Sequence, residues 1–156
     1  MPAVVRAHAA LAAVLVAAAV LLAAPFGAAA ADFRSVGNEP AILYDAPSVK
    51  ARKQYLLSRQ YPVEVVVVVQ GFSKVRDAAG DFAWVETRLL TDRRTVLVRA
   101  ASTEVRAAPD EKSALVFQAQ KDVVLELVEP PASGWARVRH SDGRSGYARL
   151  KELWGV

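Results

Sequence analysis

The chain has 156 residues, with 20 Lys and Arg against 16 Asp and Glu, and therefore a formal net charge of +4. It contains no Cys and only two His, which excludes a disulfide scaffold, a thiolate metal site and a cysteine nucleophile. The length excludes a large enzyme and suffices for one domain or two very small ones. The charge excess falls short of what a nucleic-acid-binding surface needs.

The first 31 residues have the composition of a secretory signal peptide. They hold no acidic residue, and a start containing Arg6 and His8 precedes the uncharged apolar stretch 11–24. The small residues Ala28–Ala31 fit the A-x-A rule for cleavage after Ala31, or after Ala30. We therefore predict export to the periplasm or beyond, with no stable membrane span after cleavage. An uncleaved anchor is the alternative, because residues 11–31 are apolar almost throughout.

The rest of the chain is predicted to consist of two copies of one unit. Aromatic, basic, Val, Gly and Pro positions recur in the same order in both halves. The aligned segments are Phe72–Glu86 with Trp135–Arg149, Tyr61–Val65 with Lys121–Leu125, and Pro47 with Pro109. The predicted organisation is a signal peptide at 1–31 and domains at 32–92 and 93–156.

Each copy is predicted to be built from short β-strands, because β-branched and aromatic residues cluster between Gly, Pro and polar turns. The predicted strands are Gln54–Ser58, Val63–Gln70, Phe72–Arg76, Phe82–Glu86, Thr95–Val98, Ala114–Gln118, Trp135–Arg139 and Ser145–Arg149. Asp77–Asp81 and His140–Arg144 are predicted hairpin turns. The unbroken valine run within 63–70 predicts a strand whose two faces are both buried.

This pattern predicts an all-β protein of two small β-barrels, because closing a sheet removes its exposed edges. A unit of about 60 residues is only marginally stable alone. The connector Thr91–Arg94 is short, so the two barrels are expected to touch. We place the contact near Val96–Val98 and the tail Leu153–Val156.

These segments resemble bacterial SH3 domains of a tandem, secreted type. Glu104–Pro109 resembles the family's x-V-R-x-x-P opening, and Trp135–Arg139 resembles its W-x-x-V-R strand. Gly146–Ala148 resembles its G-W-V signature with Tyr147 in place of Trp, whereas the first copy has Ala83 where that Gly would stand. The resemblance implies two tandem SH3-like barrels of the cell envelope that bind peptides, cell-wall fragments or partner proteins.

Alternation along 135–139 places Trp135, Arg137 and Arg139 on one outward face. An aromatic ring beside arginines suits a ligand with carboxylates, and the same combination anchors protein interfaces. The predicted ligand-binding residues, which include the matching aromatic positions of the first copy, are Trp135, Arg137, Arg139, Tyr147, Phe72 and Trp84. The alternative is that Trp135 covers a barrel end, that the arginines are merely solvated and that Trp84 and Tyr147 belong to the core.

The sequence predicts no catalytic residue, no cofactor and no metal site. His140 is the single His of the exported part, and it lies in Arg139–Asp142 beside a turn. Consecutive residues there do not converge as a Ser-His-Asp triad must. The protein is therefore expected to be a monomeric, non-enzymatic binding or scaffold module of the envelope. A cell-wall peptide, first of all the peptidoglycan stem peptide, is its expected partner; an envelope protein that it regulates is the alternative.

Overall fold

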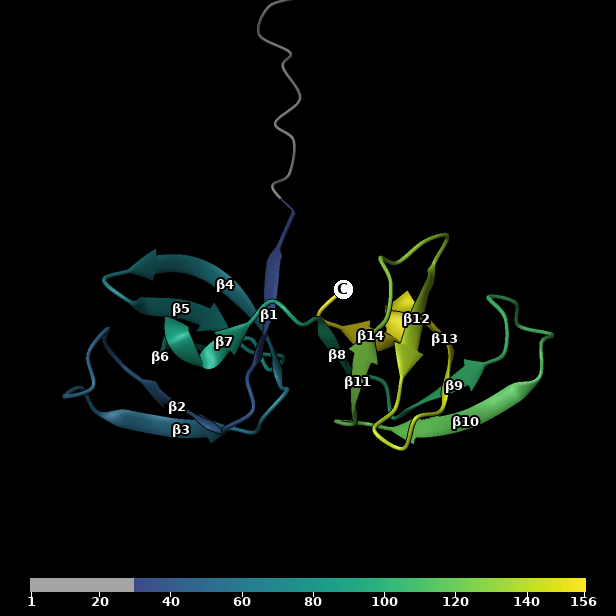
Figure 1. Ribbon diagram of the computed structural model, residues 1–156, viewed down its shortest axis with the longest axis horizontal. Coiled ribbons are helices and arrows are strands. Elements are labelled where there is room, and N and C mark those ends of the chain that lie inside the picture. The colour runs from purple at the N-terminus through teal and green to yellow at the C-terminus, as the bar shows by residue number, and fades with distance from the viewer. Residues whose placement is uncertain (1–29) are drawn as a thin grey trace, which may run out of the picture. The chain divides into compact units, whose positions relative to one another are not determined.

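The computed structural model describes residues 30–156 (Figure 1). The predicted signal peptide, except for its last two residues, lies outside this part of the chain. Residues Ala31–Val156 form one compact unit. Among residues 30–156, no helix has the length and apolar character that crossing a membrane requires.

Two antiparallel sheets of seven strands make up the unit, and the second repeats the strand order of the first. The first sheet has the order β3-β2-β6-β5-β4-β1-β7, and the second has β10-β9-β13-β12-β11-β8-β14. The strands of the first sheet are β1 (Asp32–Val36), β2 (Ala41–Tyr44), β3 (Lys53–Leu57), β4 (Pro62–Val69), β5 (Phe72–Arg76), β6 (Phe82–Glu86) and β7 (Leu90–Thr91). Each strand of the second sheet therefore corresponds to the strand seven places earlier, which confirms the tandem arrangement.

The second sheet is coloured green to yellow in Figure 1. Its strands are β8 (Thr95–Val98), β9 (Ser102–Arg106), β10 (Leu115–Gln120), β11 (Val124–Leu127), β12 (Trp135–Arg139), β13 (Ser145–Arg149) and β14 (Leu153–Trp154). A short 3-10 turn precedes the last strand of each sheet, η1 (Thr87–Leu89) and η2 (Leu150–Glu152). Both predicted hairpin turns lie where the sequence places them, between β5 and β6 and between β12 and β13.

The prediction of closed barrels is wrong, because neither sheet closes in the described part of the chain. The end strands β7 and β14 are only two residues long, and they pair with β1 and β8. Closure would require a ladder that joins β3 to β7 and β10 to β14, and the strand pairings of residues 30–156 include neither. Each sheet curves around its core with the help of β-bulges, for example between Val65 and Val67.

The valine run of β4 is also exposed where the sequence predicts burial. Val63 is fully buried, but Val66 and Val68 are 53% and 56% exposed. The reason is that β1 covers β4 only from Pro62 to Val65, so the second half of β4 pairs with β5 alone. The matching stretch of the second copy contains Pro130 and Pro131, which cannot extend a strand ladder.

The alignment of Tyr61–Val65 with Lys121–Leu125 is wrong by two residues. Gln60 and Asp122 hold the same left-handed backbone conformation, with φ of 65° and 66°. Their N–H groups donate to the carbonyls of Val36 and Val98, so these positions match at an offset of 62. The connection between β11 and β12 is longer than that between β4 and β5, and beyond it the offset is 63.

Two separate apolar cores fill the curved sheets. The first is built from small and branched side chains, namely Val36, Ala41, Leu43, Leu57, Val63, Val75, Ala83 and Val85. The second consists of Val96, Val98, Val105, Phe117, Ala119, Leu125, Ala136, Val138, Ala148 and Leu153. Ala136, Val138 and Val75 point inward as alternation predicts.

The two copies contact each other through a buried polar chain and an aromatic pair. The Thr95 hydroxyl donates to the Gln60 carbonyl at 2.7 Å, so the Ser35 hydroxyl donates to Thr95 at 2.6 Å. The rings of Phe33 and Trp154 meet edge to face at 5.2 Å. The predicted contact region is thus found at the tail, whereas Val96 and Val98 belong to the second core.

Gly155 shows how closely the tail approaches the first copy. A Cβ at this position would lie 3.0 Å from the Thr95 carbonyl oxygen and 3.1 Å from Pro62 Cβ. Its φ of 98° also favours glycine. The Gly155 carbonyl accepts a hydrogen bond from the Arg94 guanidinium at 2.9 Å.

Candidate functional site

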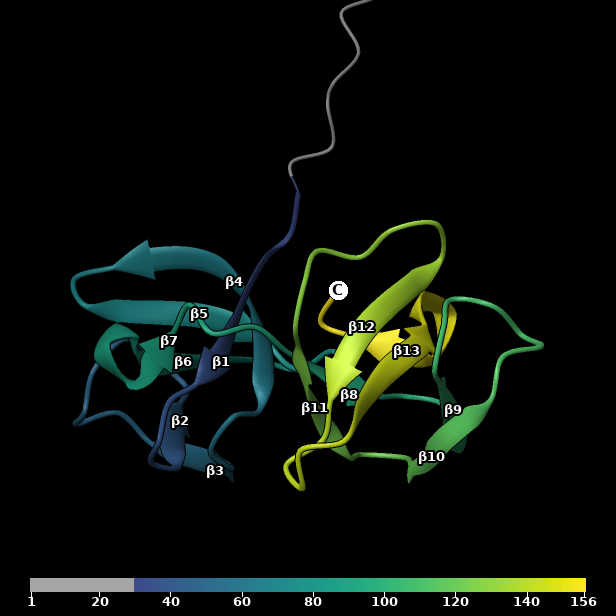
Figure 2. The same ribbon diagram turned by 45° about the vertical axis from the view of Figure 1, so that its right-hand side comes forward.

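Strand β12 presents its odd-numbered side chains outward, as predicted. Ala136 and Val138 are fully buried, whereas Trp135 is half-buried and Arg137 and Arg139 are exposed. The hairpin of β12 and β13, which Figure 2 shows from its outer side, sets the neighbours of these residues. Its register places Tyr147 opposite Arg137 and Arg149 opposite Trp135. Cross-strand partners share a face, so Tyr147 and Arg149 extend this surface.

Trp135 lies in a groove with cations other than those that the sequence predicts. The Arg149 guanidinium lies 5.3 Å from the centre of the Trp135 ring, which is cation–π distance. The groove has a volume of about 630 Å³, and Lys151 lines it beside Arg149. Asp110 and Glu111 of the β9–β10 loop also line it. The groove therefore combines one aromatic ring with two cations and two carboxylates.

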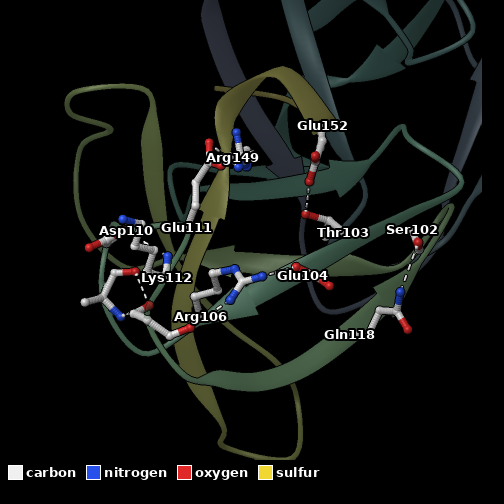
Figure 3. A network of polar contacts seen from close by, with 12 residues as sticks. Ser102, Thr103, Glu104, Arg106, Asp110, Glu111, Lys112, Gln118, Arg149 and Glu152 are labelled. Carbon is white, nitrogen blue, oxygen red and sulfur yellow. Dashed lines mark hydrogen bonds and ion pairs between the residues drawn. The ribbon is translucent and has the colours of Figure 1, made fainter.

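A polar network holds the walls of this groove (Figure 3). Glu111 forms an ion pair with Arg149, and Arg106 donates to the Ser113 carbonyl at 2.7 Å while pairing with Glu104. A second hollow of about 610 Å³ adjoins the first and shares Glu111, Arg149 and Lys151 with it. The ion pair between Glu111 and Arg149 thus lies between two accessible hollows.

The other two arginines of β12 do not line this groove. Arg137 forms an ion pair with Glu129, with 3.4 Å between Nη1 and Oε2. Arg139 lies at the far end of the strand, where its Nη1 is 3.7 Å from Glu126 Oε2. The structure therefore brings Trp135, Arg137 and Tyr147 onto one face but separates Arg139 from Trp135.

The first copy has the predicted aromatic residues in a less charged setting. The Phe72 ring meets Tyr44 edge to face at 6.3 Å, and Trp84 lies opposite both Tyr44 and Lys74. The Lys74 ammonium lies 5.6 Å from the ring of Phe82, which is itself exposed. Phe72 and Trp84 thus occupy the same positions as Trp135 and Tyr147, as the repeat predicts.

In the first copy, apolar side chains stand at positions where the second copy has charged or polar ones around the groove. At an offset of 62, Val49 matches Glu111 and Leu56 matches Gln118. Both apolar side chains are more than half exposed. In β6, Glu86 stands at the position of Arg149. The first copy therefore has no counterpart of the cation–π pair between Arg149 and Trp135.

His140 lies in the exposed β12–β13 turn. Its Nδ1 is 3.0 Å from Asp142 Oδ2, and its ring is 5.8 Å from that of Phe117. The Arg144 side chain and backbone hydrogen-bond to Asp142, and these contacts hold the pKa of that carboxyl well below its usual range. Asp142 is thus engaged with a cation at the surface. The described residues contain no cluster of three side chains able to hold a metal ion.

Arg149 and Lys151 were missed by the reasoning from sequence, although one of them had a detectable signal. The register of a hairpin centred on the predicted turn places Arg149 opposite Trp135, and that step could have been taken from the sequence. Asp110 and Glu111 gave no such signal, because a loop of this length folds back according to its tertiary contacts.

Comparison with known proteins identifies the fold family. A family model described as "Bacterial SH3 domain" matches residues 37–92 and again 100–155. No curated protein sequence matches the chain closely enough to count as a relative. Among solved structures, NlpC1 from Trichomonas vaginalis is 16% identical with a TM-score of 0.38, covering 86% of this chain and 49% of that one. NlpC2 from Trichomonas vaginalis is 15% identical with a TM-score of 0.37, covering 80% of this chain and 48% of that one.

This chain thus spans about half of the length of either solved protein. The two family matches fall one in each sheet and together cover more than half of the chain. The chain belongs to the bacterial SH3 domain family and carries the domain twice in tandem.

Proposed function

We propose that the protein is a non-enzymatic binding module of the bacterial cell envelope, and that its second domain holds the ligand. The observation that carries this proposal is the groove in which Trp135 lies against Arg149 and which Lys151, Asp110 and Glu111 also line. Bacterial SH3 domains are binding modules, and a preformed hollow with few charged groups around an aromatic ring suits that role.

The ligand proposed is a peptide of the cell wall, first of all the peptidoglycan stem peptide. Its free carboxylates suit the guanidinium of Arg149 and the ammonium of Lys151. A free amino group on the same peptide suits Asp110 and Glu111, which line the same groove. The groove therefore favours a ligand that carries both charges over one that is only acidic.

The compartment and the organisation belong to the same proposal. Residues 1–31 act as the export signal, and residues 32–92 and 93–156 form the two domains of an exported monomer. The composition of the first 31 residues supports export, because an apolar stretch of this length after a basic start is typical of a signal peptide.

A protein partner is the second candidate, and a different observation favours it. The first domain exposes Val66–Val69 together with Phe82 and Leu56. Four consecutive exposed valines exceed the singly scattered apolar side chains of an ordinary surface, and such exposure is typical of surfaces that contact other proteins. In this alternative the protein regulates an envelope enzyme or complex through its first domain.

Co-sedimentation with purified cell-wall sacculi at low and moderate salt tests the proposal. The protein should be retained, and Trp135→Ala and Arg149→Ala should each lower retention about tenfold. Arg137→Ala is the matched control, because it removes an arginine from the same hairpin face but outside the groove. Circular dichroism must show that every variant is folded. No retention at either salt concentration, or an equal loss with Arg137→Ala, would contradict the proposal.

A further inference from the structure

The two domains meet beside a further polar hollow, which is separate from the groove of Trp135 and from the hollow that adjoins it. Its volume is about 310 Å³, and its lining comes from both domains and the connector. Gln60 belongs to the first domain, Arg93 to the connector, Glu126 to β11, and Arg139 and His140 to the end of β12.

Two arginines share one carboxylate in this hollow. Arg93 Nη2 lies 3.0 Å from Glu126 Oε1, and Arg139 Nη1 lies 3.7 Å from Oε2. A guanidinium has five N–H donors in a planar fork. Two guanidiniums that share one carboxylate therefore retain unused donors. Two guanidiniums and one carboxylate leave one net positive charge next to the hollow.

The matching place in the first domain has a net charge of the opposite sign. There Glu64 accepts a hydrogen bond from Arg76 at 2.6 Å, in a pair of one acid and one base. The position of Arg93 is taken by Ala31, and that of His140 by Asp77. With His counted as neutral, the second domain carries one net positive charge at this place and the first carries one net negative charge.

The groups around the hollow are suited to an anion. Ser141 and Gln60, whose side chains carry a hydroxyl and an amide, are among the lining residues. Asp142, the residue after Ser141, is already paired with Arg144 at 2.7 Å. Arg93 and Arg139 are about half exposed, so their free donors are accessible to a ligand from solvent.

We propose that this junction hollow binds one oxyanion group, a carboxylate or a phosphate, between Arg93 and Arg139. The site does not depend on the proposed function, since it lies on different residues from the groove of Trp135. Because Gln60 comes from the first domain and Arg139 from the second, a bound anion contacts both and stabilises their docking.

Titration of the protein followed by amide NMR tests this site. The two probes are N-acetylalanine, which carries one carboxylate, and inorganic phosphate, each added at constant ionic strength against a chloride reference. We expect the amide signals of Gln60, Arg93 and Gly143 to shift in a saturable way with at least one probe, and comparison of the two identifies the preferred oxyanion. Shifts with neither probe, or only around Trp135, overturn the proposal.

Charge variants sharpen the test. Arg93→Gln and Arg139→Gln should each weaken binding about tenfold, because each removes one charge-assisted hydrogen-bond donor. Arg93→Lys keeps the charge without the fork and should weaken binding less. Arg76→Gln is the matched control at the equivalent position of the first domain. If Arg76→Gln weakens anion binding as much as Arg139→Gln does, the proposal is overturned. Melting curves establish that all four variants are folded.

Discussion

The two domains share one strand order but differ in the surfaces that the strands present. In both sheets the inward positions carry apolar side chains, most of them small or branched. Outward positions diverge: Val49 and Leu56 of the first domain correspond to Glu111 and Gln118 of the second. The comparison shows that burial preserves the core of a repeat, whereas its outer face is free to become apolar in one copy and charged in the other.

The largest expected effect tests whether the two cores are equivalent. Leu43 and Leu125 are both fully buried, one in each core. Leu43→Ala and Leu125→Ala should each lower the free energy of unfolding by about 2–5 kcal/mol, from lost burial and the cavity left behind. Both variants should still unfold in one transition in urea, because Ser35 and Thr95 join the domains through a buried hydrogen bond. Two separate transitions would show that the domains are not coupled.

A smaller effect is expected where one copy has Gly and the other Ala. A Cβ on Gly146 would lie 2.5 Å from the Arg106 carbonyl oxygen and 2.9 Å from a methyl of Val105. Gly146→Ala should therefore cost about 1–3 kcal/mol in unfolding free energy. The reciprocal change, Ala83→Gly, should cost only about 0.5–1 kcal/mol, because it only adds backbone freedom. Equal costs in urea unfolding would mean that β9 and β13 adjust to the added methyl group.

The comparison also predicts different responses to alkaline pH. Tyr55 of the first domain donates to Asp77 at 3.0 Å, and burial, this hydrogen bond and the charge of Asp77 raise its pKa. In the second domain the same positions hold Phe117 and His140. A raised tyrosine pKa means that the folded state keeps its proton longer, so this contribution to stability is complete below about pH 10 and falls as pH rises further.

Tyr55→Phe should therefore flatten the loss of stability above about pH 10. The urea midpoint measured between pH 8 and pH 11 provides the test. Burial also raises the pKa of Tyr61, so some slope should remain in the variant. An unchanged slope would mean that Tyr55 loses its proton as readily in the folded state as in the unfolded state.

The smallest effect on stability is expected at the exposed end of β4. Val68→Lys should change the unfolding free energy by no more than about 0.5 kcal/mol, because the side chain is more than half exposed. The same change should lower self-association at high protein concentration, since charged residues protect strand edges. Sedimentation velocity measures this association, and a shift in the melting curve comparable to that of Leu43→Ala would contradict the exposure of the strand.

Much of the fold could be predicted from the sequence because it depends on local patterns. Alternation along Trp135–Arg139, with a turn at His140–Arg144, gave the hairpin with the bounds that the structure has. The open sheets could not be predicted, because closure depends on the pairing of the two-residue strands β7 and β14. The exposure of Val66–Val69 depends on how far β1 extends along β4, which no property of the valines themselves reveals.

The candidate site was predicted in part for the same reason. Trp135 and Tyr147 follow from strand alternation and the repeat. Glu111 and Arg149 meet only because the β9–β10 loop folds over β13, and this contact joins residues distant in the sequence. Arg139 has the predicted outward direction but lies near Glu126 rather than near Trp135.

The three tryptophans allow the most direct measurement of the central claim, because one lies in the groove, one on the matching face of the first domain and one at the junction. The indole signals of Trp135, Trp84 and Trp154 can be followed by NMR during titration with a peptidoglycan stem peptide. If the charged groove of the second domain is the ligand site, the signal of Trp135 moves to saturation while the other two stay in place. Movement of Trp84 alone, or no movement of any indole signal at millimolar peptide, would contradict this account.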